Sequence, residues 1–137
     1  MERTTSQQQY LAQWHEGFVG SIGSMLGVIA GLMARPEARR EASHEQHEVL
    51  ERIKMILMGR EVEDVERDLA AGIVRKSTLD KIEKINVDLA DACLAHIPMA
   101  PLVREFWKQM VQIQIAQNKR AEEMRLNALQ IPIIEDQ

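Results

Sequence analysis

Apolar positions along the chain recur with the spacing of α-helices, and residues that end helices divide the chain into five segments and a tail. The dividing residues are Pro36, Gly59, Gly72, Pro98, Pro101 and Pro132. The helices expected between them cover about residues 6–34, 36–59, 61–71, 78–97 and 101–129. No stretch alternates convincingly with a period of two. The pattern therefore predicts an all-α fold, a helical bundle of four to five helices with long first and last helices.

The expected ends of these helices follow from local chemistry. Thr4, Thr5 or Ser6 is suited to cap the first helix, and Ser77 is suited to cap the fourth. Gly72 is suited to end the third helix. These boundaries predict a flexible N-terminus over residues 1–5, a single helical domain over residues 6–129 and an irregular tail over residues 130–137.

The first helix contains the most unusual segment, GFVGSIGSMLGVIAGLMA, which runs from Gly17 to Ala34 without a charged residue. Within it the glycines recur every three or four residues, so they share one side of the helix. We call this set the glycine face, and its members are Gly20, Gly23, Gly27 and Gly31. A side free of side chains allows another helix backbone to approach closely. The spacing therefore predicts that the glycine face is a packing surface.

Two interpretations of this helix remain open. Eighteen uncharged residues reach the lower limit for a membrane span, with Tyr10 and Trp14 as interface anchors at one end and Arg35 at the other. The alternative is a buried helix of a soluble bundle, in which the glycines mark close crossings with the other segments. Accordingly, the chain is expected to be membrane-associated, with a cytoplasmic location as the alternative.

The last helix predicts association with other chains. One face is expected to form its main apolar stripe. That stripe contains Val103, Phe106, Trp107, Met110, Ile113, Gln114, Gln117, Ala121, Met124 and Ala128. Val111, Ile115 and Leu126 lie beside it and make the apolar surface wider than one antiparallel neighbour covers. These three, with Gln114 and Gln117, form the expected oligomer interface, in which the two glutamines are either a buried polar layer or a wet face.

Composition and charge narrow the function classes. The chain has a net charge of −4, so no global basic field favours nucleic acid, and we expect no nucleic-acid partner. The single cysteine, Cys93, excludes an internal disulfide and is expected to be a small buried apolar residue.

Candidate catalytic and metal-binding residues are few. Glu41 and His44 have the Glu-x-x-His spacing of di-iron bundles, but helical geometry directs both away from the apolar side of their segment. His44 and His47 are three residues apart, whereas the zinc-protease motif requires four. We therefore expect no enzymatic activity, no metal and no cofactor.

Together these patterns favour a structural or assembly protein that associates through helix packing, as a homo-oligomer or as a subunit of a larger complex. Its glycine-rich helix is a candidate for insertion in a membrane, as part of a complex or pore. The alternative is a soluble helical adaptor or regulator that binds a partner protein.

Overall fold

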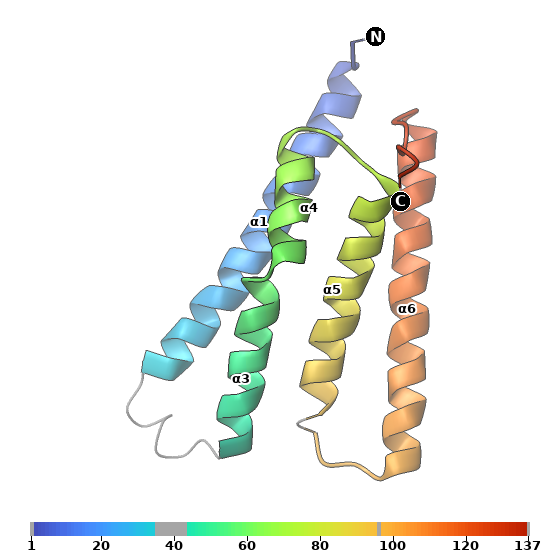
Figure 1. The fold of residues 1–137 in the computed structure, drawn as a ribbon. Coiled ribbons are helices and arrows are strands. Elements are labelled where there is room, and N and C mark those ends of the chain that lie inside the picture. Colours follow the sequence, from blue (N-terminus) through green and yellow to red (C-terminus); the bar gives the residue numbers. More distant parts are fainter. Residues whose placement is uncertain (1, 35–43, 96, 137) are drawn as a thin grey trace.

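The computed structural model describes residues 2–34, 44–95 and 97–136, and these ranges hold five α-helices (Figure 1). The helices are α1 (Thr5–Ala34), α3 (His44–Leu57), α4 (Arg60–Ala70), α5 (Lys76–Leu94) and α6 (Pro101–Ala128). No strand occurs in the described ranges, where a single parallel β-bridge joins Arg75 to Ile134. The all-α prediction, with long first and last helices, is confirmed. The expected start of the second helix at Pro36 lies outside the described residues.

The first helix begins as the sequence suggests, with Thr4 as its cap. The Thr4 hydroxyl accepts the backbone N–H of Gln7 at 3.2 Å, and the Gln7 side-chain oxygen accepts the backbone N–H of Thr4 at 2.9 Å. This reciprocal pair is a capping box. The Gln7 amide nitrogen also donates to the carbonyl oxygens of Leu129 and Gln130. One side chain thus joins the start of α1 to the end of α6.

Gly72 terminates helix α4, as predicted, two residues after its last helical residue, Ala70. Gly72 has a φ of +68°, in the left-handed region that glycine adopts at little cost. Its N–H donates to the carbonyl of Leu69 at 3.0 Å, and the N–H of Ile73 donates to the carbonyl of Asp68 at 2.8 Å. This pair of bonds is a Schellman motif, which satisfies the last carbonyls of the helix.

The predicted cap of α5 is wrong. Arg75 holds the cap position, and Ser77 lies in the first turn, where its N–H and its hydroxyl donate to the Asp136 carboxylate at 2.9 and 2.5 Å. The buried Thr78 hydroxyl accepts the N–H of Arg75 and donates to Asp68 on α4. The start of α5 is therefore fixed by the end of the chain and by α4, partners that no local pattern identifies.

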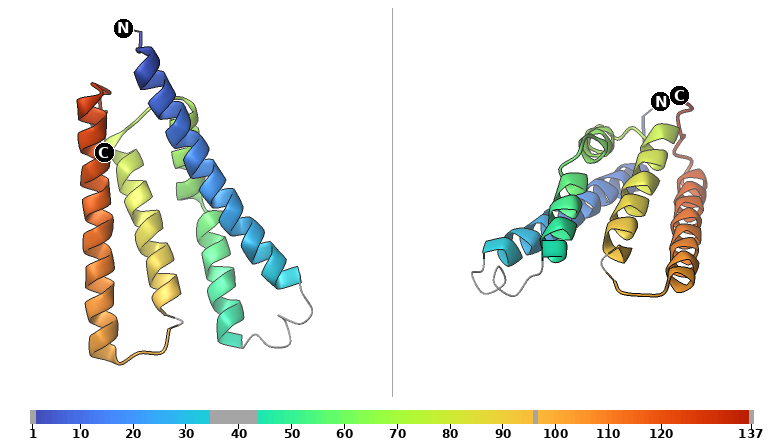
Figure 2. Two further views of the ribbon diagram at one scale, coloured as in Figure 1. Left: turned by 180° about the vertical axis from the view of Figure 1, so that it is seen from behind. Right: turned by 60° about the horizontal axis from the view of Figure 1, so that its bottom comes forward.

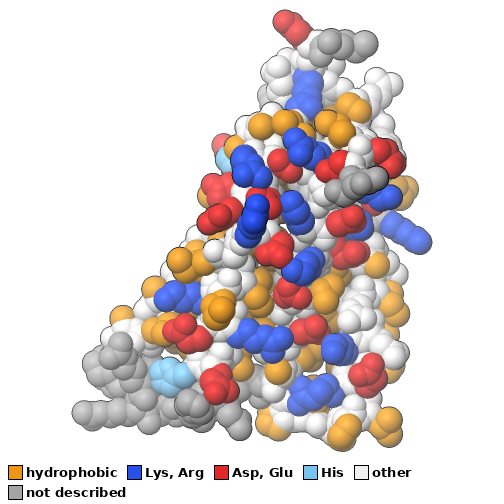
Figure 3. Space-filling view, in the orientation of Figure 1, with side chains coloured by type: hydrophobic (Ala, Val, Ile, Leu, Met, Phe, Trp, Pro, Cys, Tyr) orange, Lys and Arg blue, Asp and Glu red, His pale blue; other side chains and the backbone are white. Residues whose placement is uncertain are grey.

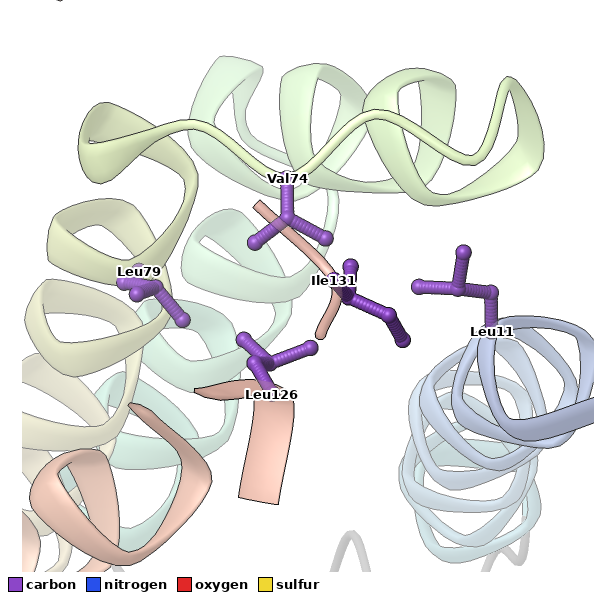
Figure 4. Close-up of a cluster of buried hydrophobic side chains, with 5 residues drawn as sticks. All are labelled: Leu11, Val74, Leu79, Leu126 and Ile131. Carbon is purple, nitrogen blue, oxygen red and sulfur yellow. The ribbon is translucent and has the colours of Figure 1, made fainter. Parts of the chain in front are cut away.

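Two clusters of buried side chains form the core. The first joins α1, the α4–α5 connection, α5, α6 and the last residues (Figure 4). Its members are Leu11, Val74, Leu79, Leu126 and Ile131. The second cluster consists of Val62, Val65 and Leu69 on α4 and Ile85 on α5. Trp14 packs against both clusters and so links them.

The arrangement leaves α1 and α6 as the outer helices (Figures 1 and 2). Helix α1 packs on α3 and α4, whereas α6 packs on α5. Charged side chains are spread over the face formed by α3, α4 and α5 (Figure 3). Ion pairs there include Lys81 with Asp64 and Lys84 with Glu61. The face formed by α3, α4 and α5 is therefore a charged surface.

Candidate functional site

Helix α1 uses the side opposite its glycines to join the fold. Leu11 and Ile29 are buried, and Phe18 and Ile22 pack against the second core cluster. These residues are separated by seven, four and seven positions, so they form one ridge along the helix. The ridge faces the bundle, with Tyr10 and Trp14 beside it, and the opposite side of α1 faces outward.

The glycine face of α1 lies on that outward side. A Cβ atom added at Gly20, Gly23, Gly27 or Gly31 would meet no neighbouring atom within 4 Å among the described residues. The glycines therefore mark no crossing with another described helix of the same chain. Of the two interpretations of α1, the one in which its glycines line internal crossings does not describe this structure.

An outward face of this composition is unusual for a helix in water. Gln9, Gln13 and Glu16 occupy the same side before Gly17, but from Gly17 to Ala34 the helix has no charged residue. Each glycine inside a helix costs about 1 kcal/mol relative to alanine. A surface without charge and with repeated glycines suits a second helix better than it suits solvent.

Two of the three expected membrane anchors face the bundle. The Tyr10 hydroxyl donates to the Glu122 carboxylate on α6, and the Tyr10 and Trp14 rings lie 6.2 Å apart. Burial and the neighbouring Glu122 carboxylate raise the pKa of Tyr10 to about 12. Arg35 lies outside the described residues. In this fold, Tyr10 and Trp14 stabilise the contact between α1 and the rest of the chain.

Three of the five α6 residues expected to bind other chains, Val111, Ile115 and Leu126, lie on the inner side of the helix, so for these three the expectation is wrong. Leu126 is fully buried in the first core cluster, and Ile115 lines a cavity with Leu79 and Ile82 of α5. Val111, one turn before Ile115, is half-buried on this α5-facing side. Gln114 and Gln117 are exposed, so within the single chain they belong to a solvent-exposed face and not to a buried polar layer. The Gln114 amide donates to the side chain of Asn118 at 3.0 Å.

Much of the predicted apolar stripe of α6 lies on the outer side of the helix. We call its most apolar part the α6 outer face, and it consists of Val103, Phe106, Trp107, Met110 and Ile113. Their exposed fractions lie between 46% for Val103 and Met110 and 58% for Phe106. The Phe106 and Trp107 rings meet edge to face, 6.4 Å apart. A contiguous aromatic and aliphatic surface of this kind is typical of interaction sites.

A groove runs between α1 and α6, with α5 as its floor. Two adjoining cavities form it, with volumes of about 220 and 390 Å³, and both are lined by Trp14, Ile82 and Asn86. Phe18 and Leu89 line the larger cavity. The larger cavity is mainly apolar, whereas charged residues of α5 and α6 share the lining of the smaller one. The groove is open along one side of the bundle, and an apolar floor with charged edges suits an amphipathic helix.

Candidate chemical sites are sparse in the described residues. No three His, Cys, Asp or Glu side chains in residues 2–34, 44–95 and 97–136 cluster to hold a metal ion. Glu41 lies outside these ranges, as does the side chain of His44. Cys93 is exposed, so the expectation of a buried cysteine is wrong. Ala92, beside it, occupies the buried position of that turn.

Comparison with known proteins gives no match to a family, to a curated protein or to a solved structure. Among the described residues, one helix, α1, is long and apolar enough to cross a membrane. This statement rests on the length and composition of the helix. The core helix of a soluble protein and a signal sequence meet the same criteria.

Proposed function

We propose that this chain is an assembly protein that associates through the glycine face of α1. The observation that carries the proposal is that an added Cβ at any of the four glycines meets nothing among the described residues. The opposite ridge of α1 holds the helix on the bundle, so the glycine face is presented outward on a fixed support. The partner we infer is a second helix, in a homo-oligomer or in a larger complex.

The chemistry of the glycine face favours a helix as its partner. Helices approach most closely where small residues recur every four positions, as Gly23, Gly27 and Gly31 do. Val19 and Val28 are exposed beside the glycines and would border such a contact. Close approach would also offset the helical cost of the glycines through van der Waals contact.

A bilayer is the second environment in which this contact could form. The length and composition of α1 support insertion. Insertion would require α1 to leave the bundle. This would break the contacts of Leu11 and the hydrogen bonds of Gln7 and Tyr10. Fractionation of cells followed by an alkaline wash tests this part. Retention of the chain in the washed membrane supports insertion, and full release places the helix contact in water.

The glycine face itself is tested by Gly27→Leu, with Gln9→Leu as the matched control. Gln9 lies eighteen residues earlier, five helical turns, so both variants place leucine on the same side of α1. Position 27 has open space around it, so Gly27→Leu should leave the melting temperature of the isolated chain unchanged or higher. We expect Gly27→Leu to abolish association through α1 and Gln9→Leu to preserve it, as measured by light scattering in buffer or detergent.

The same experiment gives the result against the proposal. If the assembly of Gly27→Leu equals that of the unmodified chain at all concentrations, the glycine face is not a contact surface. If both variants lose assembly equally, the effect comes from added apolar bulk anywhere on α1.

A soluble adaptor is a second candidate, favoured by the groove between α1 and α6. The apolar lining of its larger cavity, the charged residues of the smaller one and its open side suit capture of a partner's amphipathic helix. Asn86→Trp would fill the groove where its two cavities meet, with Asn86 exposed and outside the core clusters. Loss of binding to a panel of amphipathic helical peptides would support the adaptor function, and absence of binding by the unmodified chain would count against it.

A further inference from the structure

The α6 outer face carries a repeat that its sequence neighbours on α6 do not share. Val103, Phe106, Met110 and Ile113 are separated by three, four and three residues. This spacing is the alternation of the first and fourth positions of a heptad, the pattern of a coiled-coil seam. The four residues span about 15 Å along the helix at 1.5 Å per residue. Each is about half exposed.

Within the described chain, no other helix covers this seam. The side of α6 that packs on α5 contains Val111, Ile115 and Leu126. At 100° per residue, the centre of that side lies about 150° around the helix from the centre of the seam. Helix α6 therefore has two apolar sides, of which one is used by the fold.

From this geometry we infer that the α6 outer face pairs with the α6 outer face of a second copy, antiparallel about a two-fold axis. The inference goes beyond the glycine face, because it concerns another helix on the other side of the bundle. A two-fold pair presents the same surface from both copies, so the surface must tolerate itself. An uncharged apolar seam meets that condition.

Charge supports a second copy as the partner. Coiled coils select a different partner through charged residues beside the seam. Here those flanking positions hold Leu102, Trp107, Gln109 and Gln114, none of which is charged. No charge lies between Gln109 and Asn118. Nothing along the seam therefore repels an identical chain or selects a different one.

Charge also decides the orientation. The heptad continues through Gln117 to Arg120, so a parallel pair would place Arg120 against Arg120 of the second copy in the seam. An antiparallel pair can instead place Val103 opposite Ile113 and Phe106 opposite Met110. In that register Arg120 lies beyond the first turn of the other α6 and remains in water. The antiparallel pair thus buries the apolar layers and leaves the guanidinium groups solvated.

The surface is tested by light scattering of the full chain over a range of concentrations. The test variant is Phe106→Gln with Met110→Gln, and the control is Met55→Gln with Met124→Gln. All four residues are exposed, so neither double variant should change the melting temperature appreciably. Met55 lies on α3, and Met124 lies on α6 outside the proposed overlap. We expect the dimer dissociation constant to rise about 30-fold or more in the test variant alone, as for residues central to an interface.

The orientation is tested by disulfide formation between copies in a Cys93→Ser chain. Gln109→Cys lies near the proposed two-fold axis and should form a disulfide with itself, whereas Gln117→Cys should do so only in a parallel pair. A disulfide at position 117 and none at 109 would overturn the antiparallel register. A chain that is monomeric at tens of micromolar would overturn the pairing itself. The pairing would also be overturned if the unmodified chain were a monomer that binds phospholipid vesicles and the Phe106→Gln, Met110→Gln variant lost that binding. The α6 outer face would then be a lipid-binding surface. Gly27→Leu should leave the α6 pair intact, so the proposals for the glycine face and for the α6 outer face are tested independently.

Discussion

Tyr10 shows how a single side chain can link the two outer helices. Its ring packs against the first core cluster, and its hydroxyl donates to Glu122 on α6. Burial and the Glu122 carboxylate both oppose formation of the phenolate and raise the pKa of Tyr10 from 10.0 to about 12. The contact between α1 and α6 is therefore sensitive to alkaline pH.

The first prediction follows from the sign of this shift. The pKa in the folded chain is higher than in the unfolded chain, so the contribution of Tyr10 is complete below pH 10 and is lost between pH 10 and about 12. We expect Tyr10→Phe to remove this part of the alkaline loss of stability, measured by urea unfolding at several pH values. Tyr10 is the only tyrosine, so tyrosinate absorbance reports it directly. A midpoint near 10 in the folded chain would contradict the burial of its hydroxyl.

Gln130 gives a second prediction at this scale. It adopts a φ of +59° at the end of α6, where the N–H of Ile131 donates to the carbonyl of Leu126. A left-handed conformation costs an ordinary residue about 1–2 kcal/mol, whereas glycine adopts it freely. Gln130→Gly should therefore raise the free energy of unfolding by up to about 1 kcal/mol, after the entropic cost of glycine. As the control, Gln9→Gly inside α1 should lower it by about 1 kcal/mol.

Among the elements, the segment after α6 differs most from its expected character. The sequence predicts an irregular tail over residues 130–137, and the structure shows irregular backbone that nevertheless completes the core. Ile131 is buried, Ile134 pairs with the backbone at Val74 and Lys76, and Asp136 binds Ser77. A segment of this length has no periodicity of its own. Its partners lie more than fifty residues away, so only the folded chain shows them.

The third prediction tests this segment. Ile131→Ala leaves a cavity between Leu11, Val74 and Leu126 and should cost about 2–5 kcal/mol in the free energy of unfolding. Ile134→Ala removes a side chain that is 48% exposed and should cost much less. Urea unfolding of both variants measures the difference. Equal costs would mean that residues 131–136 do not pack as a core element.

The helices themselves were predictable because their signals are local. The start of α1 is marked by hydrogen bonds between Thr4 and Gln7, and the end of α4 is marked by the hydrogen bond of Gly72. These bonds lie within one helical turn. The orientation of α6 was not predictable, since its inward side carries Arg104 and Lys119. These charged groups reach past the core to bind the carbonyls of Leu94 and Ile97 and the carboxylate of Asp80. Long charged side chains can cover apolar surface in this way, so hydrophobicity alone does not identify the side of α6 that packs on α5.

At the scale of the whole molecule, the two proposed contact surfaces lie on different helices at the outer sides of the bundle (Figure 2). A two-fold contact through α6 closes on itself as a dimer. A second, different contact through α1 would join such dimers into larger assemblies. If both proposed contacts form, the glycine face and the α6 outer face together determine whether association stops at a dimer.

The fourth prediction concerns that size. The unmodified chain should grow beyond a dimer as its concentration rises, whereas Gly27→Leu should stop at the dimer. Combining Gly27→Leu with Phe106→Gln and Met110→Gln should give a monomer. Sedimentation velocity distinguishes the three outcomes. A triple variant that still assembles would show that another surface, such as the groove between α1 and α6, forms the contact.

The positions of the two tryptophans make the chain its own optical reporter. Trp14 packs against both core clusters, so its fluorescence emission should follow unfolding. Trp107 is half exposed on α6, so its emission should move to shorter wavelength when that face is covered. Single-tryptophan chains made by Trp14→Phe or Trp107→Phe would therefore separate the two signals. Folding can then be followed in the chain that keeps Trp14 and association in the chain that keeps Trp107, without an attached dye.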